Sequence, residues 1–304
     1  MSKAADGADR GLTTTSSDAW ALSKAVARAM TRRSTYPGFA KEVFSAAMSI
    51  ALYPAGVVSE ALKIDPAVNL GNRYHPGLPL RYLDPEAAST PVILVHGAMH
   101  NRSGFLLTKR ALKRYGYRHV DTWNYNLFGH TIEQLAQQLA DHVFDVLFDT
   151  GATRVNIVGH SLGGLIARYY IQELGGHEKV HTCITLGTPH QGTYAAIMGR
   201  GKTARQLRPG SPLLKQLKRS ARKPIPTRFV SYYSNLDSMV LPAANAKLNE
   251  PGLQAENVLC KDLGHLSLLT SPRVTRQVVQ VLANPEPVAA VRALRRGAGG
   301  SKPA

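Results

Sequence analysis

Cysteine is scarce in this chain: Cys183 and Cys260 are the only two among 304 residues. Two thiols cannot build a disulfide framework or complete a cysteine-rich zinc site, so disulfide-stapled and zinc-finger classes are excluded. No period of solenoid length repeats along the chain, which excludes a repeat architecture. No apolar run follows the polar residues 1–18, so we expect no secretory signal and a cytoplasmic location.

Long hydrophobic segments are lacking as well. The stretch 43–59 carries no charged residue, but Pro54 and Gly56 interrupt it and its length is short for a membrane span. Two helices packed on the main domain are the simplest interpretation. A helix lying in a membrane interface is the alternative, so whether residues 40–60 contact a membrane stays open.

Acidic residues are few: 20 Asp and Glu against 37 Lys and Arg give a net charge of +17. The segment 200–228 holds ten of the basic residues and no acid. It contains no aromatic residue, the next being Phe229, and no nucleic-acid-binding motif is present, so no nucleic acid is expected as a partner. An anionic membrane surface is the partner that such a segment fits, at the inner face of the membrane; a solvated basic face is the alternative.

Short β-branched runs alternate with amphipathic stretches from residue 92 onward. The run "VILV" is typical of a strand buried on both faces of a parallel sheet, and "RHVDTWNY", "RVNIV", "VHTCITLG", "TRFVSYY" and "AENVLC" continue the series. Between them, Thr131 and Gln134 form a capping-box pattern before an apolar stripe. Strands alternating with helices predict an α/β fold with a mostly parallel, doubly wound sheet.

The strand "VNIV" leads directly into "GHSLGG", and an amphipathic helix follows. A strand that turns sharply into a helix forces its serine into a strained conformation, which is tolerated only between nearly side-chain-free neighbours such as Gly159 and Gly163. The pattern predicts that Ser161 is an exposed nucleophile at the carboxyl edge of the sheet. A glycine-rich turn without chemistry is the alternative.

A nucleophilic serine needs a base, and the base needs an orienting acid; on this type of sheet they follow in the order Ser, acid, His. Among the acids after Ser161, Asp237 alone lies directly beyond a strand, with Glu250 as the runner-up. His265 follows the last predicted strand and is the expected base. His96, His160 and His190 are interpreted as packing and hydrogen-bonding residues.

Acyl transfer also needs two fixed N–H donors for the oxyanion. One is expected from Leu162, the residue after the nucleophile. The other is expected from Ala98, because the turn after "VILVHG" also ends at the carboxyl edge of the sheet.

Together "VILVHGAMHN", "NIVGHSLGG", "ITLGTPHQGT", "SNLDSMV" and "DLGHLSLL" resemble the bacterial lipases and esterases of the α/β-hydrolase fold, over residues 91–272. The resemblance implies Ser161 as nucleophile, Asp237 as acid and His265 as base, with the N–H groups of Ala98 and Leu162 as oxyanion hole. It further implies hydrolysis of a lipid or other carboxylic ester. The aspartate pair that binds calcium in some members cannot be located, so no metal and no cofactor are predicted.

The expected organisation has three parts: an N-terminal helical extension (1–72), an α/β-hydrolase domain (73–284) with a lid or cap insertion at about 194–226, and a basic flexible tail (285–304). The leading hypothesis is a serine carboxylester hydrolase acting on a hydrophobic acyl ester. Phospholipase, thioesterase and acyltransferase activities use the same triad and stay open. A non-catalytic membrane-bound scaffold is the alternative from another class.

Overall fold

A computed structural model of the chain describes residues 41–47, 84–98 and 100–284. Within these residues, six strands form one parallel sheet in the order β2-β1-β3-β4-β5-β6. The strands are β1 (Val92–Val95), β2 (Val120–Trp123), β3 (Val155–His160), β4 (Val180–Leu186), β5 (Arg228–Ser234) and β6 (Gln254–Cys260). The predicted α/β class and parallel sheet are confirmed.

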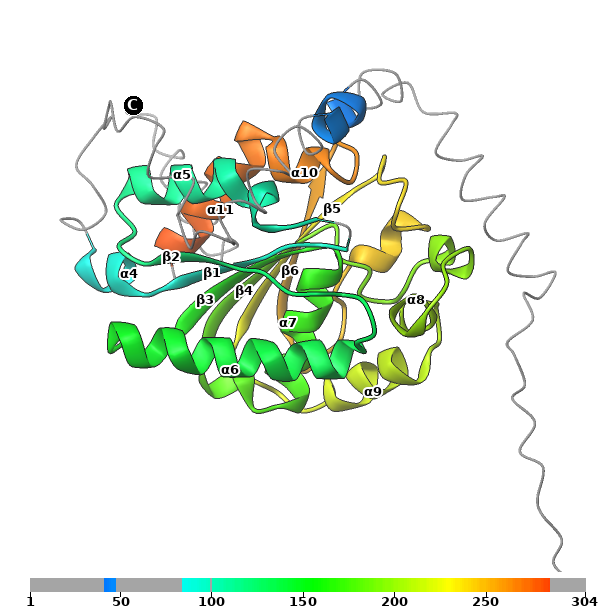
Figure 1. Ribbon diagram of the computed structural model, residues 1–304, viewed down its shortest axis with the longest axis horizontal. Helices are drawn as coiled ribbons and strands as arrows, with labels where there is room; N and C mark the ends of the chain where they lie inside the picture. Colours follow the sequence, from blue (N-terminus) through cyan, green and yellow to red (C-terminus); the bar gives the residue numbers. More distant parts are fainter. Residues whose placement is uncertain (1–40, 48–83, 99, 285–304) are drawn as a thin grey trace, which may run out of the picture.

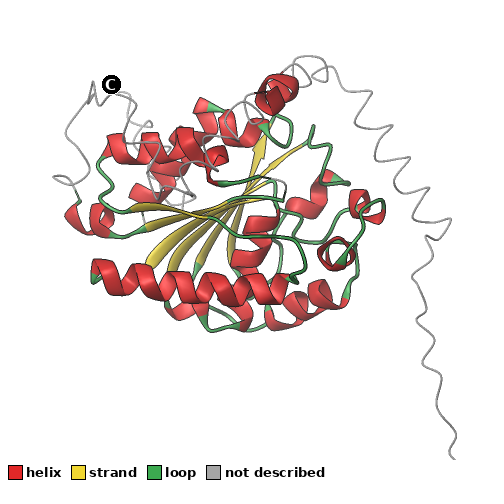
Figure 2. Cartoon of the chain, viewed as in Figure 1, coloured by secondary structure: helices red, strands yellow, loops and turns green. Residues whose placement is uncertain are grey.

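Helices cover both faces of the sheet (Figures 1 and 2). One face packs against α6 (Ile132–Thr150), α7 (Leu162–Glu173) and α9 (Pro212–Ser220), and the other against α5 (Leu106–Tyr115), α10 (Ser267–Thr270) and α11 (Pro272–Ala283). Shorter elements connect them: α4 (Pro85–Ser89), η1 (Arg102–Phe105), η2 (Gly176–Glu178), η3 (Tyr194–Ile197), α8 (Lys202–Gln206) and η4 (Ala243–Ala246). A further helical segment spans 41–47.

Burial explains the apolar runs of the central strands. All four residues of β1 are fully buried, because helices lie on both faces of the sheet and neither face meets water. Ile93 and Val95 point into the core beneath α6 and α7, whereas Val92 and Leu94 point into the core beneath α5 and α11. The sheet is therefore a rigid central layer that fixes where each strand ends.

Helix starts follow the local signals in the sequence. The predicted capping box of α6 is formed: the Thr131 hydroxyl accepts from the N–H of Gln134, whose side chain accepts from the N–H of Thr131. Helices α9 and α11 both begin with a serine followed by proline. In each, the serine hydroxyl accepts a backbone N–H of the first turn, from Leu214 in α9 and from Val274 in α11.

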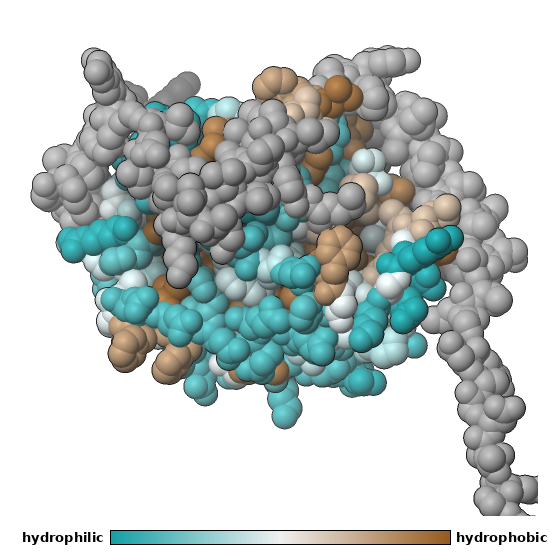
Figure 3. All heavy atoms as spheres, viewed as in Figure 1, coloured by the Kyte–Doolittle hydropathy of each residue, from teal (hydrophilic) through white to brown (hydrophobic). Residues whose placement is uncertain are grey.

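The expected cap lies between β4 and β5 and contains η3, α8 and α9. Its leucine stripe, Leu213, Leu214 and Leu217, is buried in the core against α7, so α9 is part of the body of the domain. The basic residues Lys215 and Lys218 are exposed on the opposite side of the helix. Hydrophilic side chains also gather at the α8 side of the molecule in Figure 3. Of the surface of α9, the side that carries these basic residues is therefore the one available to a partner.

Several expected features lie outside the described residues. These are the boundary at 72/73, the tail 285–304 and most of the uncharged stretch, of which residues 43–47 are helical. Among the helices that the structure describes, none combines the length and the apolar character needed to cross a membrane.

Candidate active site

Ser161 stands at the turn between β3 and α7, as predicted. Its backbone has φ 51° and ψ −121°, a conformation that costs a non-glycine residue roughly 1–3 kcal/mol. The turn is possible because its neighbours lack side chains: a Cβ at Gly159 would lie 2.5 Å from Cα of Gly164, and one at Gly163 would collide with the carbonyl oxygen of Val95. The serine is thus held at the carboxyl edge of the sheet, at the positive end of the α7 dipole.

Asp237 and His265 meet at the same edge. His265 Nδ1 lies 2.8 Å from Oδ2 of Asp237, and both side chains are buried. The other carboxylate oxygen, Oδ1, accepts backbone N–H groups of Met239 and Val240, each at 2.8 Å. The carboxylate is therefore oriented by two fixed donors, and one oxygen remains aimed at the imidazole.

The electrostatic environment favours the charged form of His265. Burial alone lowers the pKa of this imidazole, but the charge and hydrogen bond of Asp237 outweigh burial, with a smaller contribution from the charge of Glu42. The pKa of His265 is consequently raised above its usual value. Such a ring accepts a proton readily and holds it beside a buried carboxylate, which is what a general base for a serine hydroxyl requires.

Gly187, at the end of β4, makes room for this pair and was not singled out in the sequence. Its φ is 58°, and a Cβ there would lie 3.1 Å from both Asp237 Oδ2 and His265 Nδ1. The signal in the sequence was the glycine that ends the strand run "VHTCITLG". Any side chain at this position would press directly on the aspartate–histidine hydrogen bond.

The loop after β1 passes against the serine turn. A Cβ added at Gly97 would lie 3.0 Å from Cβ of Ser161, so Ala98 follows a backbone in close contact with the predicted nucleophile. Leu162 is the first residue of α7, where the backbone N–H groups of a helix have no partner within the helix. One predicted oxyanion donor, Leu162, therefore follows Ser161 directly, and the other, Ala98, lies on the loop that packs against the Ser161 turn.

The other histidines near the site are buried, and burial lowers the pKa of each of them. His160 is fully buried, and its Nε2 lies 3.2 Å from the carbonyl oxygen of His265; burial, together with the charge of His265, holds its pKa well below the usual value. Burial likewise lowers the pKa of His96 to about 4, and its ring stacks on Tyr125 at 4.2 Å. His190 Nε2 lies 2.9 Å from the Thr185 hydroxyl.

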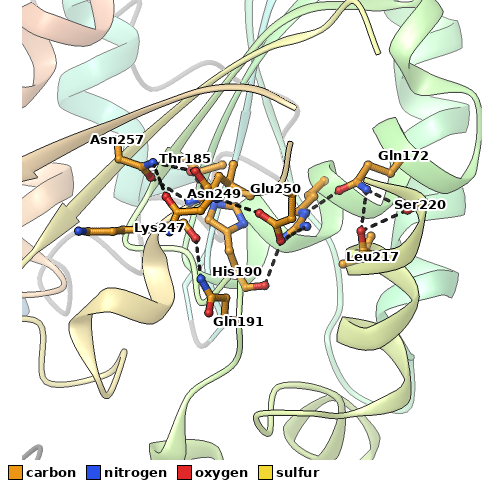
Figure 4. Close-up of polar contacts among 12 residues, drawn as sticks. Gln172, Thr185, His190, Gln191, Leu217, Ser220, Lys247, Asn249, Glu250 and Asn257 are labelled. Carbon is orange, nitrogen blue, oxygen red and sulfur yellow. Dashed lines mark hydrogen bonds and ion pairs between the residues drawn. The ribbon is translucent and has the colours of Figure 1, made fainter. Parts of the chain in front are cut away.

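Glu250, the runner-up for the acid, belongs to a different network (Figure 4). Its Oε1 lies 2.7 Å from a terminal nitrogen of Arg168, a side chain of α7 that is fully buried. The same guanidinium donates to Gln172 and to the carbonyl of His190. Gln172 in turn donates to Leu217 and Ser220, so the network joins α7, the loop after β4, α9 and the loop before β6.

We expect this network to stabilise the fold without taking part in chemistry. Arg168→Met should lower the free energy of unfolding by about 3–5 kcal/mol, because it leaves the Glu250 carboxylate without its partner in a mostly buried position. Urea unfolding measures the change, with the exposed Arg222→Met as the matched control. A loss below about 1 kcal/mol would contradict the assignment, and Arg168→Met combined with Glu250→Leu should recover part of the stability.

One further acid approaches the site from outside the predicted domain. Glu42, in the helical segment 41–47, accepts the backbone N–H groups of Leu266 and Ser267, directly after His265. The contact joins residues 224 positions apart for Leu266, and no spacing or motif in the sequence pointed to it.

Comparisons with known proteins show what the chain is similar to. The family model described as palmitoyl protein thioesterase matches residues 91–225, which include Ala98 and Ser161 and end before Asp237. Triacylglycerol lipases from Pseudarthrobacter phenanthrenivorans and Burkholderia plantarii are each 46% identical to this chain over 57 residues. The matched segment is 19% of this chain and 17% and 15% of the two lipases, so it spans less than a fifth of either relative.

Solved structures share the fold over a longer range. Bacillus licheniformis lipase BlEst2 in mature form is similar at a TM-score of 0.53 and 18% identity, covering 65% of this chain and 93% of that one. Aspergillus fumigatus lipase B is similar at a TM-score of 0.55 and 16% identity, covering 66% and 54%. The predicted α/β-hydrolase fold and the resemblance to lipases and esterases are confirmed.

Proposed function

We propose that this chain, an α/β-hydrolase related to lipases and esterases, is a serine carboxylester hydrolase that acts on a hydrophobic acyl ester. One observation carries the proposal: Ser161, in its strained turn, shares an edge of the sheet with a buried Asp237–His265 pair joined at 2.8 Å. A nucleophile, a base and an orienting acid are the minimum set for acyl transfer through a covalent intermediate.

The proposed mechanism begins at the imidazole. Its Nδ1–H donates to Asp237, which leaves the lone pair of Nε2 available for the proton of the Ser161 hydroxyl. As Oγ attacks the ester carbonyl carbon, the proton passes to Nε2 and the carbonyl oxygen becomes negative. The N–H groups of Ala98 and Leu162 would stabilise that oxyanion, each contributing about 3 kcal/mol.

The second half repeats the first with water. Collapse of the tetrahedral intermediate breaks the bond to the alcohol, which takes the proton from Nε2 and leaves an acyl-enzyme on Oγ. Water then gives a proton to Nε2 and attacks the acyl carbon, and Ser161 recovers its proton as the acid departs. The reaction consumes one ester and one water and needs no cofactor.

A thioester is the second candidate substrate, favoured by the match of residues 91–225 to the palmitoyl protein thioesterase family. Phospholipase and acyltransferase reactions use the same acyl-enzyme and differ in head group and acceptor. A fluorophosphonate probe distinguishes an enzyme from a non-catalytic scaffold, because only an activated serine is labelled. Hydrolysis of matched acyl esters, acyl thioesters and phospholipids of several chain lengths then identifies the substrate class.

The basic segment 200–228 supports a second part of the proposal, an anionic membrane surface as partner. Its exposed Lys215, Lys218, Arg219 and Arg222 have no acid among their neighbours in sequence, so they repel one another in the free protein. A surface of dense negative charge offsets that repulsion, by about 1 kcal/mol per basic residue held close to it. This fits a cytoplasmic enzyme at the inner face of the membrane.

Reversing these four residues to Glu should weaken binding to anionic vesicles by about 100-fold or more, since attraction becomes repulsion. Hydrolysis of vesicle-borne substrate should slow, whereas a short soluble ester is still cleaved normally. Salt should mimic the variant, because exposed charges are screened over about 10 Å at 0.1 M. Vesicle co-sedimentation measures the effect.

Two double variants, each with two basic residues reversed to Glu, provide the matched control. Reversing Arg154 and Lys179, which precede β3 and β4, removes as much charge as reversing Lys215 and Lys218. If both pairs weaken binding equally, net charge alone is responsible. If neither does, the segment is a solvated face.

A further inference from the structure

The loop that carries His265 is held by a carboxylate from the other end of the chain. Glu42 Oε1 accepts the N–H of Leu266 at 2.8 Å, and Oε2 accepts both the N–H and the hydroxyl of Ser267, at 2.9 and 2.8 Å. Figure 1 shows the helical segment 41–47 (blue) beside α10 (orange). Three charge-assisted hydrogen bonds therefore converge on the two residues that follow the predicted base.

The loop is shaped to admit this side chain. A Cβ at Gly264 would lie 2.5 Å from Cδ of Glu42 and still closer to its carboxylate oxygen, so a side chain before His265 would displace the Glu42 carboxylate. On the far side of the loop, Lys41 Nζ donates to the carbonyl of Asp262, a residue with φ 63°. Neighbouring residues of one helix thus hold the backbone both before and after His265.

The attachment of the helical segment is mainly polar. Val43 and Phe44 are 52% and 65% exposed, and a cleft of about 620 Å³ lies between Phe44 and the start of α11. The Ser45 hydroxyl also lies 2.7 Å from that of Thr270. Among the described residues, five hydrogen bonds join the segment 41–47 to residues 262–270, and the Glu42 carboxylate accepts three of them.

The same carboxylate acts on the imidazole by its charge. The titratable groups that influence or contact His265 are Asp237 and Glu42, which favour its protonated form, and the neighbouring His100 and His160, whose own pKa values are lowered by burial and by His265. His160 also holds the His265 carbonyl from the β3 side. Glu42 is thus the second negative group, after Asp237, that stabilises the charged imidazole.

We propose that Glu42 is a positioning residue for His265: by bridging the N–H groups of Leu266 and Ser267 it fixes the loop on which the imidazole faces Asp237 and the Ser161 turn. This inference rests on the proposed function for its catalytic consequence. It also assigns residues 41–47, which lie outside the resemblance to lipases, to the working active site.

Glu42→Gln tests the inference, because it keeps the size of the side chain but removes the charge and places an amide NH₂ among backbone donors. We expect kcat for a soluble ester to fall about 10- to 100-fold through misplacement of the base. The pKa of His265 should also fall, since a stabilising negative charge is lost. The rise of kcat/KM with pH, which follows deprotonation of this base, should therefore move to lower pH.

Two further variants separate position from charge. Glu42→Asp keeps the charge but shortens the reach, so it should preserve the pKa of His265 better than Glu42→Gln while still lowering kcat. Glu86→Gln removes a carboxylate from an exposed position on α4 and should change neither quantity. Thermal unfolding of each variant shows whether the fold is retained.

The pKa of His265 is measured by NMR titration of its ring protons, which requires no turnover. If wild-type protein neither hydrolyses esters nor labels with a fluorophosphonate, the proposed function fails, and the titration still tests the contact. If Glu42→Gln folds and keeps both the wild-type pKa of His265 and the wild-type kcat, the role of Glu42 is overturned.

Discussion

Ser161→Ala is expected to leave a folded protein whose ester hydrolysis is about 10⁶-fold slower, the loss measured where a triad nucleophile has been removed. Oγ is the atom that forms the acyl bond, and no other hydroxyl is held in this turn between β3 and α7. Alanine has the same Cβ, so the strained φ of 51° and the contacts of the neighbouring glycines are unchanged. Initial rates on a chromogenic ester measure the effect.

Ser89→Ala, which removes a hydroxyl from α4 near the amino end of β1, is the matched control and should keep wild-type turnover. Circular dichroism and thermal unfolding of both variants check the fold. The assignment of Ser161 as nucleophile is wrong if the purified Ser161→Ala protein keeps more than a few per cent of wild-type turnover. Loss of fluorophosphonate labelling in the same protein provides a second readout.

Asp237→Asn should lower turnover by about 10⁴-fold with little change in melting temperature. The N–H groups of Met239 and Val240 require an acceptor, so the amide oxygen of the substituted side chain takes the place of Oδ1 and its NH₂ faces His265. The imidazole must then accept at Nδ1 and carry its proton on Nε2. In that tautomer Nε2 has no lone pair for the serine proton, and the base is lost.

The pH dependence of the wild-type enzyme follows from the same pair. Because the pKa of His265 is raised, kcat/KM should rise with pH through a value higher than the ordinary pKa of histidine as the imidazole loses its proton. In the residual activity of Asp237→Asn this rise should move to lower pH. Glu250→Gln is the control: a loss of activity there that matches Asp237→Asn in a fully folded protein would identify the later acid as the partner of His265.

Much of this molecule follows from sequence patterns that act locally. Strand runs such as "VILV", the cap of α6 and the sharp turn at Ser161 are predicted correctly because each depends on neighbours a few residues away. The relation of Ser161 to Asp237 and His265 is also accessible, since parallel strands all end at one edge of the sheet. Residues that follow successive strands of such a sheet therefore lie near one another at this edge.

Other features depend on contacts that no local pattern encodes. The leucines of α9 form the same amphipathic stripe whether they face a lipid surface or a core, and only the packing against α7 places them inside. Glu250 resembles any loop acid until the buried Arg168 is seen to pair with it. In the same way, Glu42 meets the His265 loop across 224 residues of chain, because the fold brings two distant backbones together and a hydrogen bond depends on distance in space alone.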